Sequence, residues 1–254
     1  TAVITNPDRL VGRKKVLTAP PVKNRIMNYE LRIREKIAIL QPDQLSSIYN
    51  SLLQIRPTFG ILAAYGKIIP KEIIDIFPKG IIVVHPSLLP KYRGATPIQS
   101  AILADEKETG TTLIVMDEKV DHGKIISNFQ FPISNNDNYE TLLKKLAGLS
   151  ADLLIETLPK YLNEEIKPQE QDHSQATYTK KFTSDDGFID YSVILNESEE
   201  SQKNIWLKIR ALNPEPGVYT IKNGRRMKLL AADLINRKLI LRKIQFEGEK
   251  AKSL

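Results

Sequence analysis

Short apolar runs alternate with amphipathic stretches along the first half of the chain. The runs are rich in β-branched residues, which is typical of strands buried on both faces of a parallel sheet. They occupy residues 2–4, 36–40, 59–64, 81–84 and 111–116. The stretches between them carry helix start signals, such as Pro70 and Pro97. This alternation predicts right-handed crossovers, and therefore a mostly parallel α/β sheet.

The second half of the chain has a different pattern. Leucines and isoleucines at helical spacing predict a long amphipathic helix over residues 138–162, and residues 198–212 predict another. Alternating stretches then predict strands, with Asn223-Gly224 as a favourable hairpin turn. These stretches are residues 218–222, 227–233 and 239–246. We therefore predict a first domain over residues 1–162, a polar linker over residues 163–197 and a smaller β-rich domain over residues 198–254.

The segment from Asn6 to Pro21 interrupts the alternation. It contains three prolines, one glycine and a dense group of cations, and we predict that it forms neither strand nor helix. A flexible surface loop suffices to explain this composition.

Positive charge is concentrated towards the two ends. The 254 residues carry a formal charge of +7, and cations gather within residues 9–25 and again within residues 225–243. Solvated surface explains such clusters in most basic proteins, whereas two separated clusters also suit a long phosphate backbone. Cysteine is absent, which excludes disulfides and thiolate metal sites. No apolar run has the length needed to cross a bilayer, so we expect no membrane partner.

Two residues are candidates for chemistry. His85 directly follows the apolar run at residues 81–84, and the carboxyl edge of an open parallel sheet is where ligands bind. Taken alone, this placement fits a structural histidine better than a catalytic one, and Asp121, close before Gly123, is an ordinary turn former. The sequence shows no glycine-rich phosphate loop, no metal-ligand spacing and no serine nucleophile motif, so we expect no metal.

Five segments resemble the signatures of one family. They are TNPDRLVGRKKVLTAPPVK from Thr5, AAYGKIIP from Ala63, HPSLLPKYRGATPIQSAI from His85, TGTTLIVMDEKVDHGKII from Thr109 and RALNPEPGVY from Arg210. Together they are similar to the methionyl-tRNA formyltransferases, within the folate-dependent formyltransferase family, over nearly the whole chain. The resemblance implies a Rossmann-like sheet and a reduced OB-like C-terminal domain. Since relatives begin about one βα unit earlier, we expect an N-terminal βα unit to be missing.

The resemblance also implies an activity. Members transfer a formyl group from the co-substrate 10-formyltetrahydrofolate to the amino group of initiator methionyl-tRNA, in preparation for translation initiation. It further implies a metal-independent monomer in the bacterial cytoplasm, although a mitochondrial matrix protein without its transit peptide would have the same features. A sugar-nucleotide amine formyltransferase is the alternative, but the basic loop near the N-terminus is not expected there.

The family assigns its chemistry to an Asn, a His and an Asp. His85 and Asp121 match the last two, and Asp121 is expected to orient His85 by a hydrogen bond. Val83 occupies the position of the Asn, and its side chain offers no donor for the negative oxygen of the tetrahedral adduct. Three interpretations stay open: a substitute donor such as His122, a slow enzyme, or a non-catalytic protein that binds tRNA or folate.

The resemblance assigns two binding segments as well. Folate contacts correspond to Ser87, Leu88, Leu89 and Pro90, and contacts to the acceptor arm of the tRNA correspond to Arg9, Arg13, Lys14 and Lys15. Arg93 either neutralises a substrate phosphate or holds its loop by a salt bridge.

Overall fold

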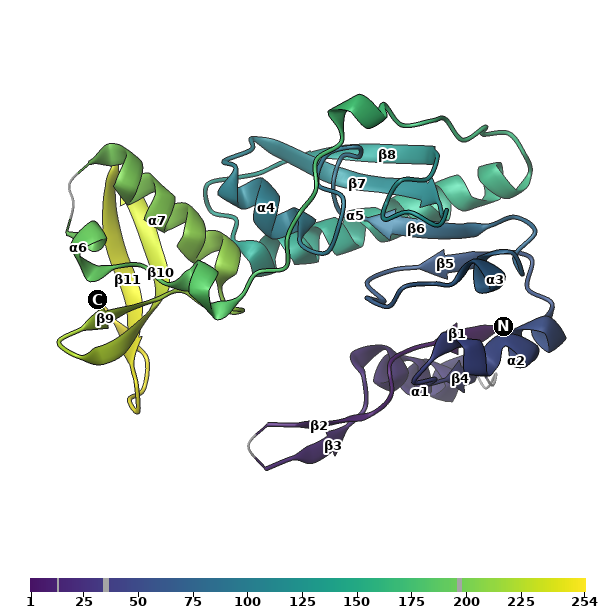
Figure 1. Cartoon of the computed structure of the whole chain (residues 1–254), viewed down its shortest axis with the longest axis horizontal. Coiled ribbons are helices and arrows are strands. Elements are labelled where there is room, and N and C mark those ends of the chain that lie inside the picture. The colour runs from purple at the N-terminus through teal and green to yellow at the C-terminus, as the bar shows by residue number, and fades with distance from the viewer. Residues whose placement is uncertain (13, 34–36, 196–197) are drawn as a thin grey trace. The chain divides into compact units, whose positions relative to one another are not determined.

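The structure is a computed structural model that describes residues 1–12, 14–33, 37–195 and 198–254. It divides into two compact units. The first contains Thr1–Val84 and Ile114–Lys124, and the second contains His85–Leu113 and Ile125–Leu254. Figure 1 labels most of the helices and strands of both.

The first unit is built from parallel strand pairs linked by helices. β1 (Ala2–Ile4) pairs in parallel with β4 (Ala38–Leu40), and β5 (Gly60–Leu62) pairs in parallel with β6 (Ile81–His85). The helices are α1 (Pro21–Ile33), a 3-10 helix (Leu45–Ile48), α2 (Tyr49–Ile55) and α3 (Lys71–Ile74). One cluster of buried side chains in this unit consists of Leu45, Ile48, Leu52 and Ile73, and the strand residues Ile81, Ile82 and Val83 are buried as well. The predicted α/β architecture with parallel strands is confirmed.

The basic segment near the N-terminus is a β-hairpin, so the prediction of neither strand nor helix was wrong. β2 (Arg9–Val11) pairs antiparallel with β3 (Val16–Thr18), with Leu10 opposite Leu17. The prolines lie outside the paired residues, so they do not interrupt the ladder. Gly12 adopts a positive φ of 73° at the beginning of the turn, which glycine does without steric cost.

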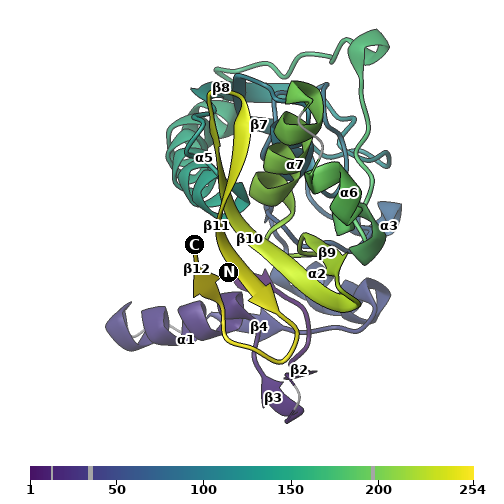
Figure 2. The ribbon, with the colours of Figure 1, turned by 90° about the vertical axis from the view of Figure 1, so that its left-hand side faces the viewer.

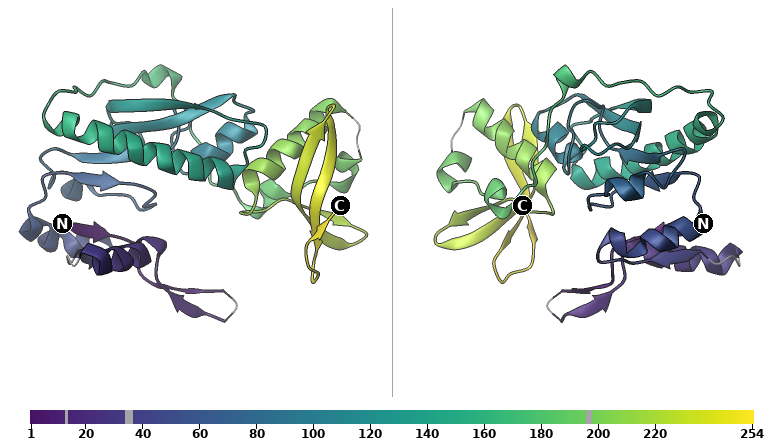
Figure 3. Two further views of the ribbon diagram at one scale, coloured as in Figure 1. Left: turned by 180° about the vertical axis from the view of Figure 1, so that it is seen from behind. Right: turned by 45° about the vertical axis from the view of Figure 1, so that its right-hand side comes forward.

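The second unit begins with two neighbouring strands and two helices. β7 (Glu108–Val115) lies beside β8 (Ile125–Pro132), and α5 (Tyr139–Leu162) packs against β8 and α4 (Pro97–Leu103), as Figure 3 shows. A capping box starts α5: Asn138 Oδ1 accepts from the Thr141 N–H at 3.0 Å, and Thr141 Oγ1 accepts from the Asn138 N–H at 2.9 Å. The sequence prediction of one long helix is confirmed.

A helix and an antiparallel sheet complete the second unit. α7 (Glu199–Leu212) lies against a sheet of order β12-β11-β10-β9, seen in Figure 2. Its strands are β9 (Tyr219–Lys222), β10 (Arg225–Ile235), β11 (Lys238–Phe246) and β12 (Lys252–Ser253). Asn223 and Gly224 have φ values of 51° and 73°, and two successive positive φ values identify the predicted hairpin turn as type I′. The predicted β-rich C-terminal region is confirmed.

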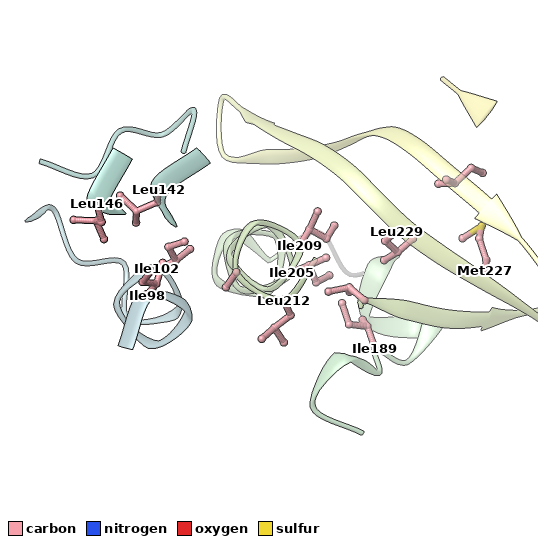
Figure 4. Close-up of a cluster of buried hydrophobic side chains, with 13 residues drawn as sticks. Ile98, Ile102, Leu142, Leu146, Ile189, Ile205, Ile209, Leu212, Met227 and Leu229 are labelled. Atoms are coloured by element: carbon pink, nitrogen blue, oxygen red, sulfur yellow. The ribbon is translucent and has the colours of Figure 1, made fainter. Parts of the chain in front are cut away.

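α7 is buried on both sides. Figure 4 shows Ile98, Ile102, Leu142 and Leu146 on one side of this helix and Ile189, Met227 and Leu229 on the other. All of them belong to one hydrophobic cluster. The antiparallel sheet therefore shares a continuous core with α4 and α5 inside the second unit. The predicted domain boundaries, 1–162, 163–197 and 198–254, stay a prediction.

The polar segment predicted as the linker has short regular elements and specific partners in the second unit. It contains 3-10 helices at His173–Gln175 and Ser184–Gly187, followed by α6 (Tyr191–Ile194). Isolated β-bridges join Gln169 to Ile125 and Tyr178 to Arg93. The backbone of residues 169–180 is thus fixed by hydrogen bonds rather than by apolar side chains. We call residues 169–180 the connecting segment.

Candidate active site

His85 ends β6 and belongs to the second unit, where its side chain is 5 % exposed. Its Nε2 lies 3.0 Å from the backbone oxygen of Tyr92. A carbonyl oxygen can only accept, so Nε2 carries the hydrogen of this bond. The backbone oxygen of His85 accepts from Thr111 Oγ1 at 3.2 Å. Both the ring and the backbone of His85 are therefore fixed by the protein.

The loop after His85 is held by Thr112 of β7. Thr112 Oγ1 donates to the backbone oxygen of Ser87 at 2.6 Å and accepts from the Leu89 N–H at 3.1 Å. The Ser87 hydroxyl donates to the backbone oxygen of Lys91 at 2.8 Å. The side chains of Ser87 and Leu89 are buried, whereas those of Leu88 and Pro90 are partly exposed. The assignment of these four residues to folate binding stays a prediction.

Tyr92 has an unusual backbone and three fixed polar groups. Its φ is 61°, in the left-handed region that residues with a side chain rarely adopt. Its backbone oxygen accepts from His85, its N–H donates to Thr177 Oγ1 at 2.8 Å, and its hydroxyl donates to Glu106 Oε1 at 2.7 Å. Burial, together with the hydrogen bond to Glu106, raises the pKa of the Tyr92 hydroxyl, so it stays a donor at physiological pH.

Arg93 joins this loop to the connecting segment. The side chain is 1 % exposed, and its Nη2 contacts Gln171 Oε1 at 2.6 Å and His173 Nδ1 at 2.8 Å. Its Nη1 donates to the Tyr178 hydroxyl at 3.2 Å. All three acceptors are neutral, so within the described residues Arg93 holds its loop by hydrogen bonds and not by the salt bridge of the loop-holding interpretation. This burial supports the loop-holding role over contact with a substrate phosphate.

Asp121 lies on a tight turn of the first unit. It has a φ of 48°, and Gly123 follows two residues later. A Cβ at Gly123 would lie 1.8 Å from the backbone oxygen of Val115, so only glycine fits there. His122 Nδ1 lies 2.6 Å from Asp117 Oδ2, which ties this turn together. Because Asp121 and His85 belong to different units, their predicted hydrogen bond stays a prediction.

Val83 lies in the middle of β6, opposite Leu62 of β5, and is 5 % exposed. Its side chain is packed in the sheet, as the apolar run predicts. It provides no hydrogen-bond donor at the position where the family has an amide. The role of His122 as a substitute donor stays a prediction.

The β2–β3 hairpin presents the predicted RNA-binding residues. Arg9, Lys14 and Lys15 are exposed, while Arg13 lies outside the described residues. Four apolar side chains of the same hairpin are also exposed: Leu10, Val11, Val16 and Leu17. Exposed cations of this kind can neutralise the phosphates of a nucleic acid.

Three residues that the sequence did not single out fix the base of this hairpin. Lys23 Nζ contacts Asp8 Oδ2 at 2.9 Å and Gln41 Oε1 at 2.8 Å, and Gln41 Nε2 donates to Asp8 Oδ1 at 2.8 Å. Hydrogen bonds from Gln41 and Lys23 lower the pKa of the Asp8 carboxyl. We call Asp8, Lys23 and Gln41 the hairpin clamp.

Tyr92 and Thr177 were also missed, although Tyr92 lies within a matched segment. Their hydrogen bond joins residues 85 positions apart, and nothing local in the sequence indicates it.

Among the described residues, no group of three or more His, Asp or Glu side chains is arranged to hold a metal ion. Within the same residues, every helix is too short or too polar to cross a membrane.

The comparisons with known proteins agree on the family. The profile of the Formyl transferase family matches residues 1–158, and that of its C-terminal domain matches residues 182–243. A methionyl-tRNA formyltransferase of Bacillus subtilis is 40 % identical over 235 residues, which cover 92 % of this chain and 70 % of that protein. One from Dictyoglomus turgidum is 39 % identical, covering 91 % and 71 %.

Solved structures of low sequence identity have the same fold. The methionyl-tRNA formyltransferase of Clostridium thermocellum superimposes with a TM-score of 0.62 at 21 % identity, covering 89 % of this chain and 93 % of that one. HypX from Aquifex aeolicus, solved with tetrahydrofolic acid, gives a TM-score of 0.68 at 15 % identity, covering 99 % and 45 %. The sequence relatives, rather than these folds, identify the chain, which belongs to the methionyl-tRNA formyltransferase family.

Proposed function

We propose that this protein transfers the formyl group of 10-formyltetrahydrofolate to the amino group of initiator methionyl-tRNA. The observation that carries the proposal is the 40 % identity to a methionyl-tRNA formyltransferase over 92 % of the chain. The matching segments include the His85 loop and the Asp121 turn. Folate serves as a co-substrate, and the reaction uses no metal. We also propose that the protein acts as a monomer in the bacterial cytoplasm.

Formyl transfer sets three requirements for a protein. The amine attacks the formyl carbon, the carbonyl oxygen becomes negative, and a proton has to leave the amine while N10 of the folate gains one. In the proposed mechanism, His85 takes the proton of the amine at Nδ1, the charged ring so formed stabilises the negative oxygen, and Asp121 orients and stabilises this charged form. The proton of Nε2 is bonded to Tyr92 in the resting structure.

The β2–β3 hairpin supports tRNA as the acceptor. Its exposed Arg9, Lys14 and Lys15 can neutralise phosphates, while the hairpin clamp fixes the strands that carry them. A sugar-nucleotide acceptor gives no reason for such a hairpin. Val83 favours a second candidate function, a non-catalytic tRNA- or folate-binding protein, because it removes one donor to the reacting oxygen.

A formylation assay with purified protein tests the proposal. The protein is given 10-formyltetrahydrofolate and one of three acceptors: initiator methionyl-tRNA, elongator methionyl-tRNA or a sugar-nucleotide amine. We expect formyl-methionyl-tRNA from the initiator acceptor, at a low rate. Formylation of the sugar-nucleotide amine alone would show that the protein is a sugar-nucleotide formyltransferase instead. Binding of both substrates without product would establish the non-catalytic function.

A further inference from the structure

Tyr92 connects His85 to a part of the chain that was expected to be only a linker. Its backbone oxygen holds His85 Nε2, and its N–H is held by Thr177 Oγ1 of the connecting segment. The two hydrogen bonds use the backbone of Tyr92 to link the Thr177 side chain to the His85 ring. All three residues lie within the second unit.

The left-handed backbone of Tyr92 requires support from its surroundings. A residue with a side chain is disfavoured at a φ of 61°, and such conformations persist where neighbouring structure imposes them. The direction of the Tyr92 backbone oxygen depends on this conformation. Whatever holds Tyr92 in the left-handed region therefore also determines where His85 finds its acceptor.

The connecting segment provides that support. The Arg93 N–H donates to the backbone oxygen of Thr177 at 2.9 Å, and the Thr179 N–H donates to the backbone oxygen of Arg93 at 2.8 Å. The buried Arg93 side chain adds its bonds to Gln171 and His173. On its other side, the Tyr92 hydroxyl is anchored on Glu106. Tyr92 is thus fixed from two directions, and its N–H is held by the Thr177 side chain.

Gly94 shows how closely the connecting segment approaches the loop. Its φ is 110°, and a Cβ there would lie 2.7 Å from Thr179 Oγ1. A side chain at position 94 would push the segment away from Arg93 and Tyr92. The glycine of the matched motif is therefore needed for this contact.

We propose that Thr177 and Tyr92 are positioning residues that keep the hydrogen of His85 on Nε2. Nε2–H is committed to a backbone oxygen, so proton exchange by the ring is confined to Nδ1. The part of this proposal that concerns catalysis rests on the proposed function, whereas the hydrogen position does not. The connecting segment then influences the protonation of His85 through one hydrogen bond, from the Tyr92 N–H to Thr177 Oγ1.

The test measures the imidazole directly. Nitrogen-15 spectra of histidine-labelled protein, recorded at alkaline pH where imidazoles are neutral, distinguish a protonated from an unprotonated ring nitrogen. The signals of His85 are identified by their loss in H85Q. We expect a protonated Nε2 and an unprotonated Nδ1 in the unmodified protein. A neutral ring with its hydrogen on Nδ1 would overturn the proposal, whatever the activity.

Variants then test the role of Thr177. T177V keeps the shape but removes the acceptor for the Tyr92 N–H, and we expect a mixture of His85 tautomers and a kcat about tenfold lower, with KM for tRNA unchanged. T177S keeps the hydroxyl and should restore both. T179V is the matched control, because Thr179 Oγ1 accepts from the Thr96 N–H and not from Tyr92.

The outcomes separate this proposal from the proposed function. Equal loss of kcat in T177V and T179V with an unchanged His85 spectrum would show that the Thr177 hydroxyl does not position the ring. A protein that forms no formyl-methionyl-tRNA, but whose His85 spectrum has the expected tautomer and responds to T177V, would refute the activity and leave the positioning role intact.

Discussion

The hairpin in the first unit and the His85 loop in the second are held in opposite ways. The hairpin is exposed, and its base is fixed by an ion pair, Lys23 with Asp8, whose side chains are 24 % and 29 % exposed. The His85 loop is largely buried, and the Arg93 cation that fixes it bonds to three neutral acceptors. One segment presents charge to solvent, and the other keeps polar groups in fixed bonds.

This difference corresponds to two different tasks. A surface that binds a polyanion needs accessible cations, and small movements of its side chains cost little. A group that exchanges a proton needs a fixed position within a few tenths of an ångström. The two segments should therefore respond to mutation in different parameters: the hairpin in tRNA affinity and the loop in kcat.

Replacing His85 by alanine is expected to have the largest effect. Without its imidazole the site loses both the acceptor of the amine proton and the charged ring that then stabilises the oxygen, so kcat should fall by about 10³-fold. The dissociation constant for tRNA should not change, because the hairpin is untouched. Single-turnover formylation and tRNA filter binding measure the two effects. A tRNA affinity that falls together with kcat would contradict the separation of tasks.

Replacing Val83 by asparagine should produce the next largest effect, and in the opposite direction. If no other group replaces the missing donor, kcat should rise by roughly 10²-fold, the size of effect found for one oxyanion donor. The buried amide should also lower the melting temperature, since it loses water on burial. Calorimetry and steady-state formylation measure both.

The control for this prediction is Val84→Asn, which puts the same amide on the opposite face of β6. This variant should lose stability without gaining rate. An unchanged kcat in the folded Val83→Asn protein would indicate that another group, such as His122, already serves as donor. Comparing His122→Gln in both backgrounds would then identify it.

The sequence predicted best where local chemistry decides the structure. The apolar run before His85 and the Asn223-Gly224 turn each act over a few residues, and each is found as expected. The hairpin was missed because flanking prolines and cations outweighed two short apolar strands in the composition.

The support of His85 was missed for a different reason. The side-chain bonds of Arg93, and the bond from the Tyr92 N–H to Thr177, reach residues 78 to 85 positions away, and they join backbone and polar side chains. Such contacts leave no hydrophobic periodicity, so a polar composition alone indicated a linker. Family resemblance identified His85 and Asp121 as candidate reacting residues, but it gave no information on what positions His85.

Replacing Arg9 and Lys14 together by alanine tests the hairpin side of the comparison. The tRNA dissociation constant should rise by about tenfold, and the slope of its logarithm against the logarithm of salt concentration should fall by about two. The constant for folate should not change. The matched control is Lys144→Ala with Lys160→Ala, which removes the same charge from exposed positions on α5. Equal salt slopes in the two variants would mean that net charge, and not the hairpin, attracts the tRNA.

Replacing Asp8 by asparagine should produce the smallest effect and the most specific one. The variant loses the ion pair at the base of the hairpin, so KM for tRNA should rise roughly threefold while kcat stays constant. A change of this size matches the small free-energy contribution of a partly exposed ion pair. Asp75→Asn is the control, because it breaks the exposed Lys71–Asp75 pair at 2.7 Å in the same unit. Equal changes of KM in the two variants would mean that the hairpin clamp has no specific effect on tRNA binding.

Acid provides a second way to release the same clamp. Gln41 and Lys23 hold the pKa of Asp8 below its ordinary value of 3.8, so the ionised carboxylate stabilises the folded hairpin above that pH. This contribution is lost only as the pH falls from 3.8 through the lowered pKa of the folded protein. Hydrogen exchange of the β2 and β3 amides should therefore accelerate in that acid window, and it should do so at every pH in Asp8→Asn. In Asp8→Asn the exchange of these amides should show no further change across that window. The same acid response in this variant would mean that a group other than Asp8 releases the hairpin.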